Sequence, residues 1–157
     1  MKKVLFLFLA IAIASCSANK QQENYTVSQP QNVQNNQKDA DAINEFNKFA
    51  NNNPLYFNFD SSKIEDISLI EKYRNEMNKL GKNVKYTITG MCDNRGSDDY
   101  NDKLGLKRAS AVKQALGKNF NISTKSNGKR NFKKEYNNDE ENYQANRKAV
   151  VIAEKVK

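Results

Sequence analysis

Apolar positions along the chain recur at two kinds of spacing, which predict helices and strands in alternation. Apolar side chains three and four positions apart predict helices over residues 39–51, 64–80 and 104–116. Alternating or continuous apolar runs predict strands over residues 55–59, 84–89, 122–128 and 149–153, of which 122–128 has the weakest pattern. Gly81 and Gly117 follow two of the helices, where a left-handed residue commonly ends a helix.

The polar segments between these elements complete the order along the chain. Residues 90–97 and 130–141 are predicted to be loops, and residues 143–147 a short helix. The order β-α-β-α-β-α-β predicts an α/β (α+β) sandwich, with helices packed on one face of a small mixed sheet. Residues 54–157 would form this domain, and the helical lead-in over 39–53 would pack against it.

The N-terminus has the pattern of an export signal over residues 1–15. Lys2 and Lys3 precede an apolar run over 4–13, which is shorter than the about 20 residues of a membrane-spanning helix. The sequence Ile-Ala-Ser-Cys that ends at Cys16 resembles the lipobox of bacterial lipoproteins. That resemblance implies acylation of Cys16, which would begin the mature chain. An ordinary secretory signal with an incidental cysteine, or a short anchor helix, are the alternatives.

A polar stretch separates Cys16 from the predicted domain. Eleven of the twenty residues from Asn19 to Lys38 are Asn or Gln, too polar to offset the entropy of ordering. Residues 16–38 are therefore predicted to be a lipidated N-terminus with a flexible tether. Ser17 follows the cysteine where an Asp would retain such a protein in the inner membrane of enteric-type bacteria, which implies the outer membrane.

Composition restricts the chemistry. The chain has no His, which removes the commonest general base and zinc ligand, so an enzyme, a metal site and a cofactor are not expected. Its net charge of +8 favours an acidic or mixed-charge partner. Nucleic acid is a poor candidate because of the export signal, and the basic run over 129–134 is predicted to be a solvated loop. Cys92 is expected to be a small buried residue rather than the disulfide partner of Cys16, with a reactive or dimerising thiol as an alternative.

The most informative stretch covers residues 88–116. Two spaced motifs occur there, G-x-x-D-x-x-G and N-x-x-L-G-x-x-R-A-x-x-V, at Gly90, Asp93, Gly96, Asn101, Leu104, Gly105, Arg108, Ala109 and Val112. Together with Asp60 in F-x-F-D and with Asn146-Arg147, they resemble the OmpA-like peptidoglycan-binding family over about residues 55–153. The chain departs from the family pattern at Met91, at Phe132 and Lys148, and through most of 121–138.

The resemblance implies a ligand, the diaminopimelate side chain of the peptidoglycan stem peptide. Its free end carries an ammonium and a carboxylate on one carbon, so a protein that recognises this end needs an anion and a cation close together. Asp93 would accept from the ammonium, while Arg108 would hold the carboxylate in a fork of hydrogen bonds, aided by N–H groups at the helix start. Further contributors implied by the family are Asp60, Gly96, Asn101, Leu104 and Arg147.

Plainer roles remain open for the same side chains. Asp93 and Arg108 could form a salt bridge that fixes the loop on the helix, and Asn101 could cap that helix. Asp60 could merely end its strand, and Arg147 could be a surface cation.

The resemblance also implies a biological role. The protein would be an outer-membrane lipoprotein whose domain faces the periplasm, binds peptidoglycan non-covalently and tethers the outer membrane to the wall. A TolB-type periplasmic protein would be a further partner. The alternative is a generic OmpA-like envelope lipoprotein that binds peptidoglycan without that partner.

Overall fold

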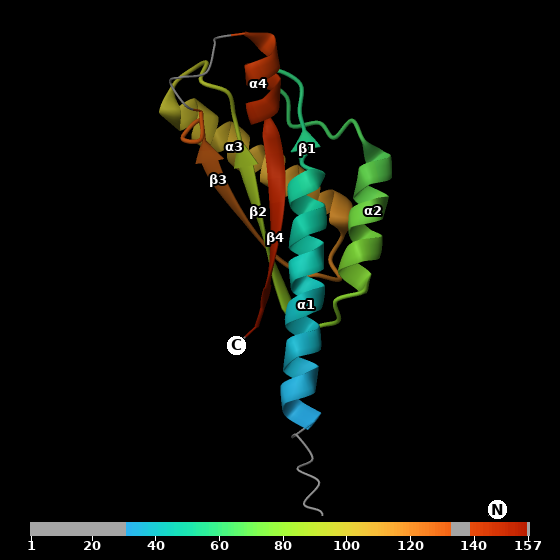
Figure 1. Ribbon diagram of the computed structural model, residues 1–157. Coiled ribbons are helices and arrows are strands. Elements are labelled where there is room, and N and C mark those ends of the chain that lie inside the picture. The colour runs from blue at the N-terminus through green and yellow to red at the C-terminus, as the bar shows by residue number, and fades with distance from the viewer. Residues whose placement is uncertain (1–30, 133–138, 157) are drawn as a thin grey trace, which may run out of the picture.

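The structure is a computed structural model that describes residues 31–132 and 139–156, with side chains from residue 37 (Figure 1). The expected export signal, Cys16, Ser17 and residues 19–30 lie outside the described residues. The elements, in chain order, are α1 (Gln31–Asn52), β1 (Leu55–Tyr56), α2 (Ile67–Asn78), β2 (Val84–Met91), α3 (Asp98–Leu116), β3 (Asn121–Gly128), α4 (Glu140–Asn146) and β4 (Lys148–Lys155). In the described part of the chain, no helix is both long and apolar enough to cross a membrane.

The strands form a mixed sheet in the order β1-β4-β2-β3. β2 runs parallel to β3 and antiparallel to β4, and β4 is antiparallel to the short β1. Alternate residues of β2 point to one face, where Tyr86 lies opposite Ala153, and Ile88 opposite Val151, on β4. Apolar faces of α1, α2 and α3 join these residues in one core. The expected sandwich of helices on one side of a small sheet is confirmed.

The helical lead-in is longer than the sequence pattern predicted. α1 begins at Gln31, so residues 31–38 of the segment expected to be a tether are helical. Among the residues of α1 whose side chains are described, those from 37 on, the buried ones are Ile43, Phe46 and Ala50 in its later turns. A helix nucleated by those packed turns can extend through Gln, Asn and Lys residues, because each added residue gains a backbone hydrogen bond without a nucleation cost. Apolar periodicity detects only the packed part.

Several other boundaries also differ from the predicted ones. β1 ends at Tyr56, and α2 begins only at Ile67, because the carboxylate of Asp66 caps it by accepting from Leu69 N at 2.9 Å. β2 continues through Met91, which was predicted to lie in a loop. α4 begins at Glu140, three residues before the predicted helix, after its cap Asp139. Of the loop predicted over 130–141, residues 133–138 lie outside the described residues.

α3 packs on the sheet at a point where two backbones touch. A Cβ added at Gly90 would lie 1.9 Å from the carbonyl oxygen of Gly105 and 2.7 Å from its carbonyl carbon. The distance is far below van der Waals contact, and both atoms belong to the backbone. This approach sets how closely α3 lies against the end of β2.

Gly90→Ala is therefore expected to lower the free energy of unfolding by about 3 kcal/mol, because backbone must move apart to admit the methyl group. Gly81→Ala is the matched control, since nothing lies within 4 Å of its Cβ position and only its φ of +76° is unfavourable. Gly81→Ala should lower the free energy of unfolding by about 1 kcal/mol. Urea unfolding followed by circular dichroism measures both, and equal losses would contradict the close approach.

Candidate functional site

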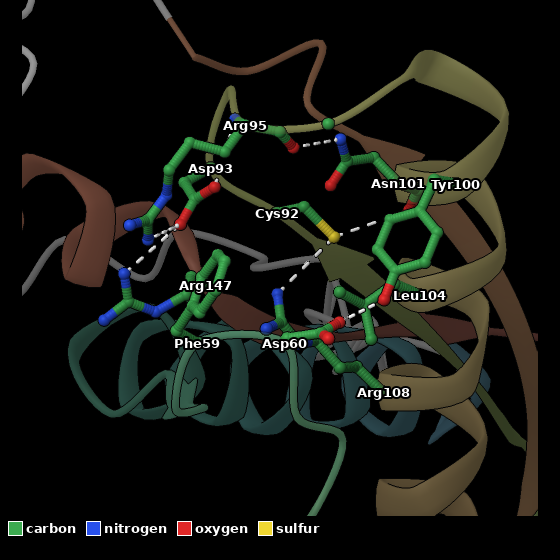
Figure 2. Close-up of a pocket in the computed structure, with 11 residues that line it drawn as sticks. Phe59, Asp60, Cys92, Asp93, Arg95, Tyr100, Asn101, Leu104, Arg108 and Arg147 are labelled. Carbon is green, nitrogen blue, oxygen red and sulfur yellow. Dashed lines mark hydrogen bonds and ion pairs between the residues drawn. The ribbon is translucent and has the colours of Figure 1, made fainter.

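A pocket of about 130 Å³ opens where β2 ends and α3 begins (Figure 2). Its walls come from the segment after β1, the loop between β2 and α3, the first turns of α3, and the junction of α4 and β4. The lining residues are Phe59, Asp60, Cys92, Asp93, Arg95, Gly96, Tyr100, Asn101, Leu104, Arg108 and Arg147. All seven ligand-binding residues expected from the sequence are among them, whereas Cys16 lies outside the described residues.

Asp93 is the buried anion of the pocket. It lies two residues beyond the end of β2, where Cys92 N donates to Gly128 O at 2.8 Å, and it is 3 % exposed. Its Oδ2 pairs with Arg95 Nη2 at 2.6 Å and with Arg147 Nη1 at 3.2 Å. Burial raises the pKa of Asp93, but the hydrogen bonds from the two arginines outweigh it and hold the pKa below its usual value. The carboxylate is therefore charged at neutral pH.

Arg108 is also wholly buried, but it faces backbone carbonyls instead of Asp93. Nε donates to Ser61 O at 2.8 Å, Nη1 to Met91 O at 2.7 Å and Nη2 to Asn58 O at 3.1 Å. Nη1 also contacts Cys92 Sγ at 3.4 Å, so one N–H of the guanidinium's five is left. Burial lowers the pKa of Arg108.

These contacts answer one alternative left open by the sequence. Within the described residues, Asp93 pairs with Arg95 and Arg147, so the plain Asp93–Arg108 salt bridge is wrong. The dashed lines of Figure 2 run from those two arginines to Asp93, and from Arg108 to Cys92. The expected fork of two hydrogen bonds from Arg108 to a ligand would require that one of these acceptors gives up its N–H, because one N–H alone cannot form a fork.

Arg147 is the second cation at Asp93. It is 3 % exposed, so the surface-cation alternative is wrong. Nε donates to Phe57 O at 3.1 Å, and Nη2 donates to Glu140 at 2.6 Å and to the side chain of Gln144. These bonds fix the guanidinium between the segment after β1 and α4.

Asn101 and Gly96 shape the loop between β2 and α3. The Asn101 amide donates to Arg95 O at 2.7 Å and to Ser97 O at 3.0 Å, which orders the loop. The capping alternative for Asn101 is wrong, because Ser97 caps α3 by accepting from Tyr100 N at 3.2 Å. Gly96 has a φ of +84°, a conformation that other residues rarely adopt.

Asp60 and Leu104 lie at the open side of the pocket. Asp60 has a φ of 52° and accepts a hydrogen bond from the hydroxyl of Tyr100, so it connects the segment after β1 to α3. Leu104 supplies an apolar wall from the second turn of α3. Cys92 is 2 % exposed, as expected of a small buried residue, and burial raises the pKa of its thiol.

Sequence reasoning missed Arg95 and the aromatic rings beside it. The Arg95 guanidinium lies 4.0 Å from the centre of the Phe59 ring and 4.2 Å from that of Tyr143. The sequence offered one signal for Arg95, since it is a basic residue two positions after the expected ligand-binding Asp93. The ring of Tyr143 could not be found from that signal, because α4 is distant in sequence.

The charges suit a ligand end that carries both signs. Three arginines and two aspartates line the pocket, and the buried carboxylate is paired with two of the guanidinium groups. A ligand ammonium can bond Asp93, while a neighbouring carboxylate meets positive charge. Over the described ranges, no group of three or more acidic or cysteine side chains could hold a metal ion.

The sequence model of the OmpA family matches residues 56–147. Two curated relatives are named peptidoglycan-associated lipoprotein. The one from Buchnera aphidicola is 33% identical over 67% of this chain and 63% of its own length, and the one from Pasteurella multocida is 32% identical over 63% and 69%. The crystal structure of the peptidoglycan-associated lipoprotein from Burkholderia pseudomallei aligns with a TM-score of 0.58 at 29% identity, over 64% of this chain and 89% of that one.

Proposed function

The chain belongs to the OmpA family, and we propose that it binds the peptidoglycan cell wall non-covalently and catalyses no reaction. The ligand group is the free end of diaminopimelate in the stem peptide, which carries an ammonium and a carboxylate on one carbon. The two similar lipoproteins are named for their association with peptidoglycan, which supports this choice. The pocket supplies the recognition, since its seven expected ligand-binding residues lie together.

One observation carries the proposal: Asp93 is a buried carboxylate on the wall of an open pocket. Its arginine partners keep it ionised, so it can accept hydrogen bonds from the ligand ammonium. The carboxylate on the same carbon then lies within reach of the guanidinium groups. Arg108 and Arg147 contribute positive charge from fixed positions, because both are bonded to backbone carbonyls.

Each site would bind weakly, but attachment would be firm overall. A few charge-assisted hydrogen bonds offset by association entropy give a dissociation constant of roughly millimolar to micromolar. Many copies anchored in one membrane face a polymer of repeated stem peptides, which multiplies the attachment. Bonds that break and re-form singly would let the wall grow while the membrane stays attached.

We further propose that Cys16 carries the lipid anchor and that the protein resides in the outer membrane with its domain in the periplasm. The role is that of the Pal component of a Tol–Pal system, with a TolB-type protein as partner. A generic OmpA-like envelope lipoprotein outside that system is the alternative. Co-purification with a TolB-type protein from the native envelope would separate the two.

Sedimentation with purified peptidoglycan tests the wall-binding proposal. The protein should pellet with peptidoglycan that contains diaminopimelate, and free diaminopimelate should release it. Peptidoglycan that carries lysine in place of diaminopimelate is the matched control, because its side chain ends in an ammonium without a carboxylate. Equal binding to both polymers would contradict the proposed ligand.

Cys16→Ala tests the anchor. The native protein should carry acyl mass on Cys16, the first residue of the mature chain, and partition with the outer-membrane fraction. The variant should lack that mass and leave the outer membrane, because no buried acyl chain holds it there. Mass spectrometry and membrane fractionation measure both, and Cys92→Ala, at a buried cysteine of the domain, is the control that should remain anchored. A native chain without acyl mass would refute the anchor.

A further inference from the structure

Arg95 occupies the position at Asp93 that a ligand ammonium would need. Its Nη2 lies 2.6 Å from Asp93 Oδ2, and its backbone N–H donates to Oδ1 at 3.2 Å. The guanidinium stacks between the rings of Phe59 and Tyr143, 4.0 Å and 4.2 Å from their centres. It also approaches Glu140 at 3.8 Å. The pocket therefore contains an internal cation at the place where the ligand ammonium would bind.

Of the two arginines at Asp93, only Arg95 is placed to exchange partners. Arg147 has a side chain that is 4% exposed and is also bonded to Phe57 O at 3.1 Å and to Glu140 at 2.6 Å. The Arg95 side chain is 34% exposed. Its Nε is buried and, among the described residues, has no hydrogen-bond partner. A buried donor without a partner is costly, so an incoming acceptor at this position would be favoured.

We propose that Arg95 sets the specificity of the pocket for ligand ends that carry an ammonium and a carboxylate together. This inference rests on the proposed function and refines it. The ligand ammonium takes the place of Arg95 Nη2 at Asp93. The released guanidinium, which the two rings keep beside the pocket, donates from Nη2 and Nε to the ligand carboxylate. Arg108 cannot supply this fork alone, because one N–H of its guanidinium remains.

Exchange of partners makes the two ligand charges depend on each other. An ammonium without a carboxylate must break the Asp93–Arg95 pair and leave the guanidinium uncompensated. A carboxylate without an ammonium finds Arg95 already paired. A ligand that carries both replaces one ion pair by two. Diaminopimelate, cadaverine and pimelate form a matched set of probes, because cadaverine lacks the carboxylates and pimelate lacks the ammonium groups.

Titration of the full chain in detergent with each probe, for the native protein and Arg95→Gln, tests the proposal. Arg95→Gln should bind diaminopimelate about tenfold more weakly and cadaverine about tenfold more tightly, so the preference falls about a hundredfold. The gain for cadaverine arises because Asp93 loses a competing cation while Arg147 keeps it ionised. Arg74→Gln, which removes an arginine paired with Glu71 on α2, is the control and should leave the preference unchanged.

One result would overturn the role of Arg95: an unchanged ratio of the affinities for diaminopimelate and cadaverine, whether both weaken equally or neither changes. If Arg95→Gln does not fold by circular dichroism, the native protein decides through the nitrogen resonance of Arg95 Nε. That resonance should move on saturation with diaminopimelate and not with pimelate, and an unmoved resonance counts against the proposal. Failure of the wall-binding function is a separate outcome, in which the native protein binds neither peptidoglycan nor diaminopimelate.

Discussion

Asp93→Asn will abolish co-sedimentation with peptidoglycan while the domain stays folded. The substitution keeps the size of the side chain and one acceptor oxygen but removes the charge that a ligand ammonium needs. Loss of a charge-assisted hydrogen bond of about 1.5–3 kcal/mol weakens binding by roughly tenfold to a hundredfold. Because each site is weak, that loss is enough to leave the protein in the supernatant.

Asp102→Asn is the matched control for this substitution. Asp102 also pairs with an arginine, since its Oδ1 lies 2.5 Å from Arg130 Nη1, but it does not line the pocket. Its variant should sediment like the native protein. Circular dichroism before each assay separates loss of binding from loss of fold. Native-like sedimentation of folded Asp93→Asn would remove the anion from the recognition mechanism.

Arg108→Met will destabilise the domain before it reports on binding. The guanidinium is wholly buried and bonds the carbonyls of Asn58, Ser61 and Met91. Methionine fills part of the volume but removes the donors to all three carbonyls, of which that of Met91 is buried and the other two are part-buried. A buried acceptor without a donor costs about 1–3 kcal/mol. The expected loss in the free energy of unfolding is about 3–5 kcal/mol. Losses of this size come from a few kinds of change, among them the breaking of a buried hydrogen-bond network.

Lys107→Met, at the exposed neighbour on α3, is the control and should change stability by less than about 1 kcal/mol. Urea unfolding of both variants measures the difference. A small loss for Arg108→Met would mean that the segment after β1 does not depend on this guanidinium. Arg108 would then be free to serve the ligand alone.

Seven of the residues that line the pocket could be predicted from the sequence, but the pairing among its side chains could not. Asp93 and Arg108 lie in two neighbouring motifs, and the β2-to-α3 connection brings both to the same end of the sheet. The partners of Asp93 are instead Arg95, two positions away, and Arg147, 54 positions away. The contact with Arg147 depends on β4 lying beside β2, with Ala149 opposite Gly90. Pairing of distant strands leaves no local pattern.

The same limit explains what was missed around Arg95. The ring of Phe59 follows a strand that ends early, and Tyr143 belongs to α4, which reaches the pocket only through β4. α1 illustrates the opposite case. Its packed turns show apolar periodicity in the sequence, whereas residues 31–38 are mostly Gln and Asn, a composition that predicts a tether.

α1 attaches to the sheet along its edge, where the side chain of Asn47 acts like a neighbouring strand. Its Oδ1 accepts from Ala153 N at 2.8 Å, and its Nδ2 donates to Ala153 O at 3.0 Å. In Figure 1 the N-terminal end of α1 and the end of β2 that leads to the pocket lie at opposite ends of the domain. A pull between a membrane and a wall would thus run lengthwise through the molecule and load α1 in shear. Contacts loaded in shear would yield together, so under the proposed function this orientation would let the domain carry tension.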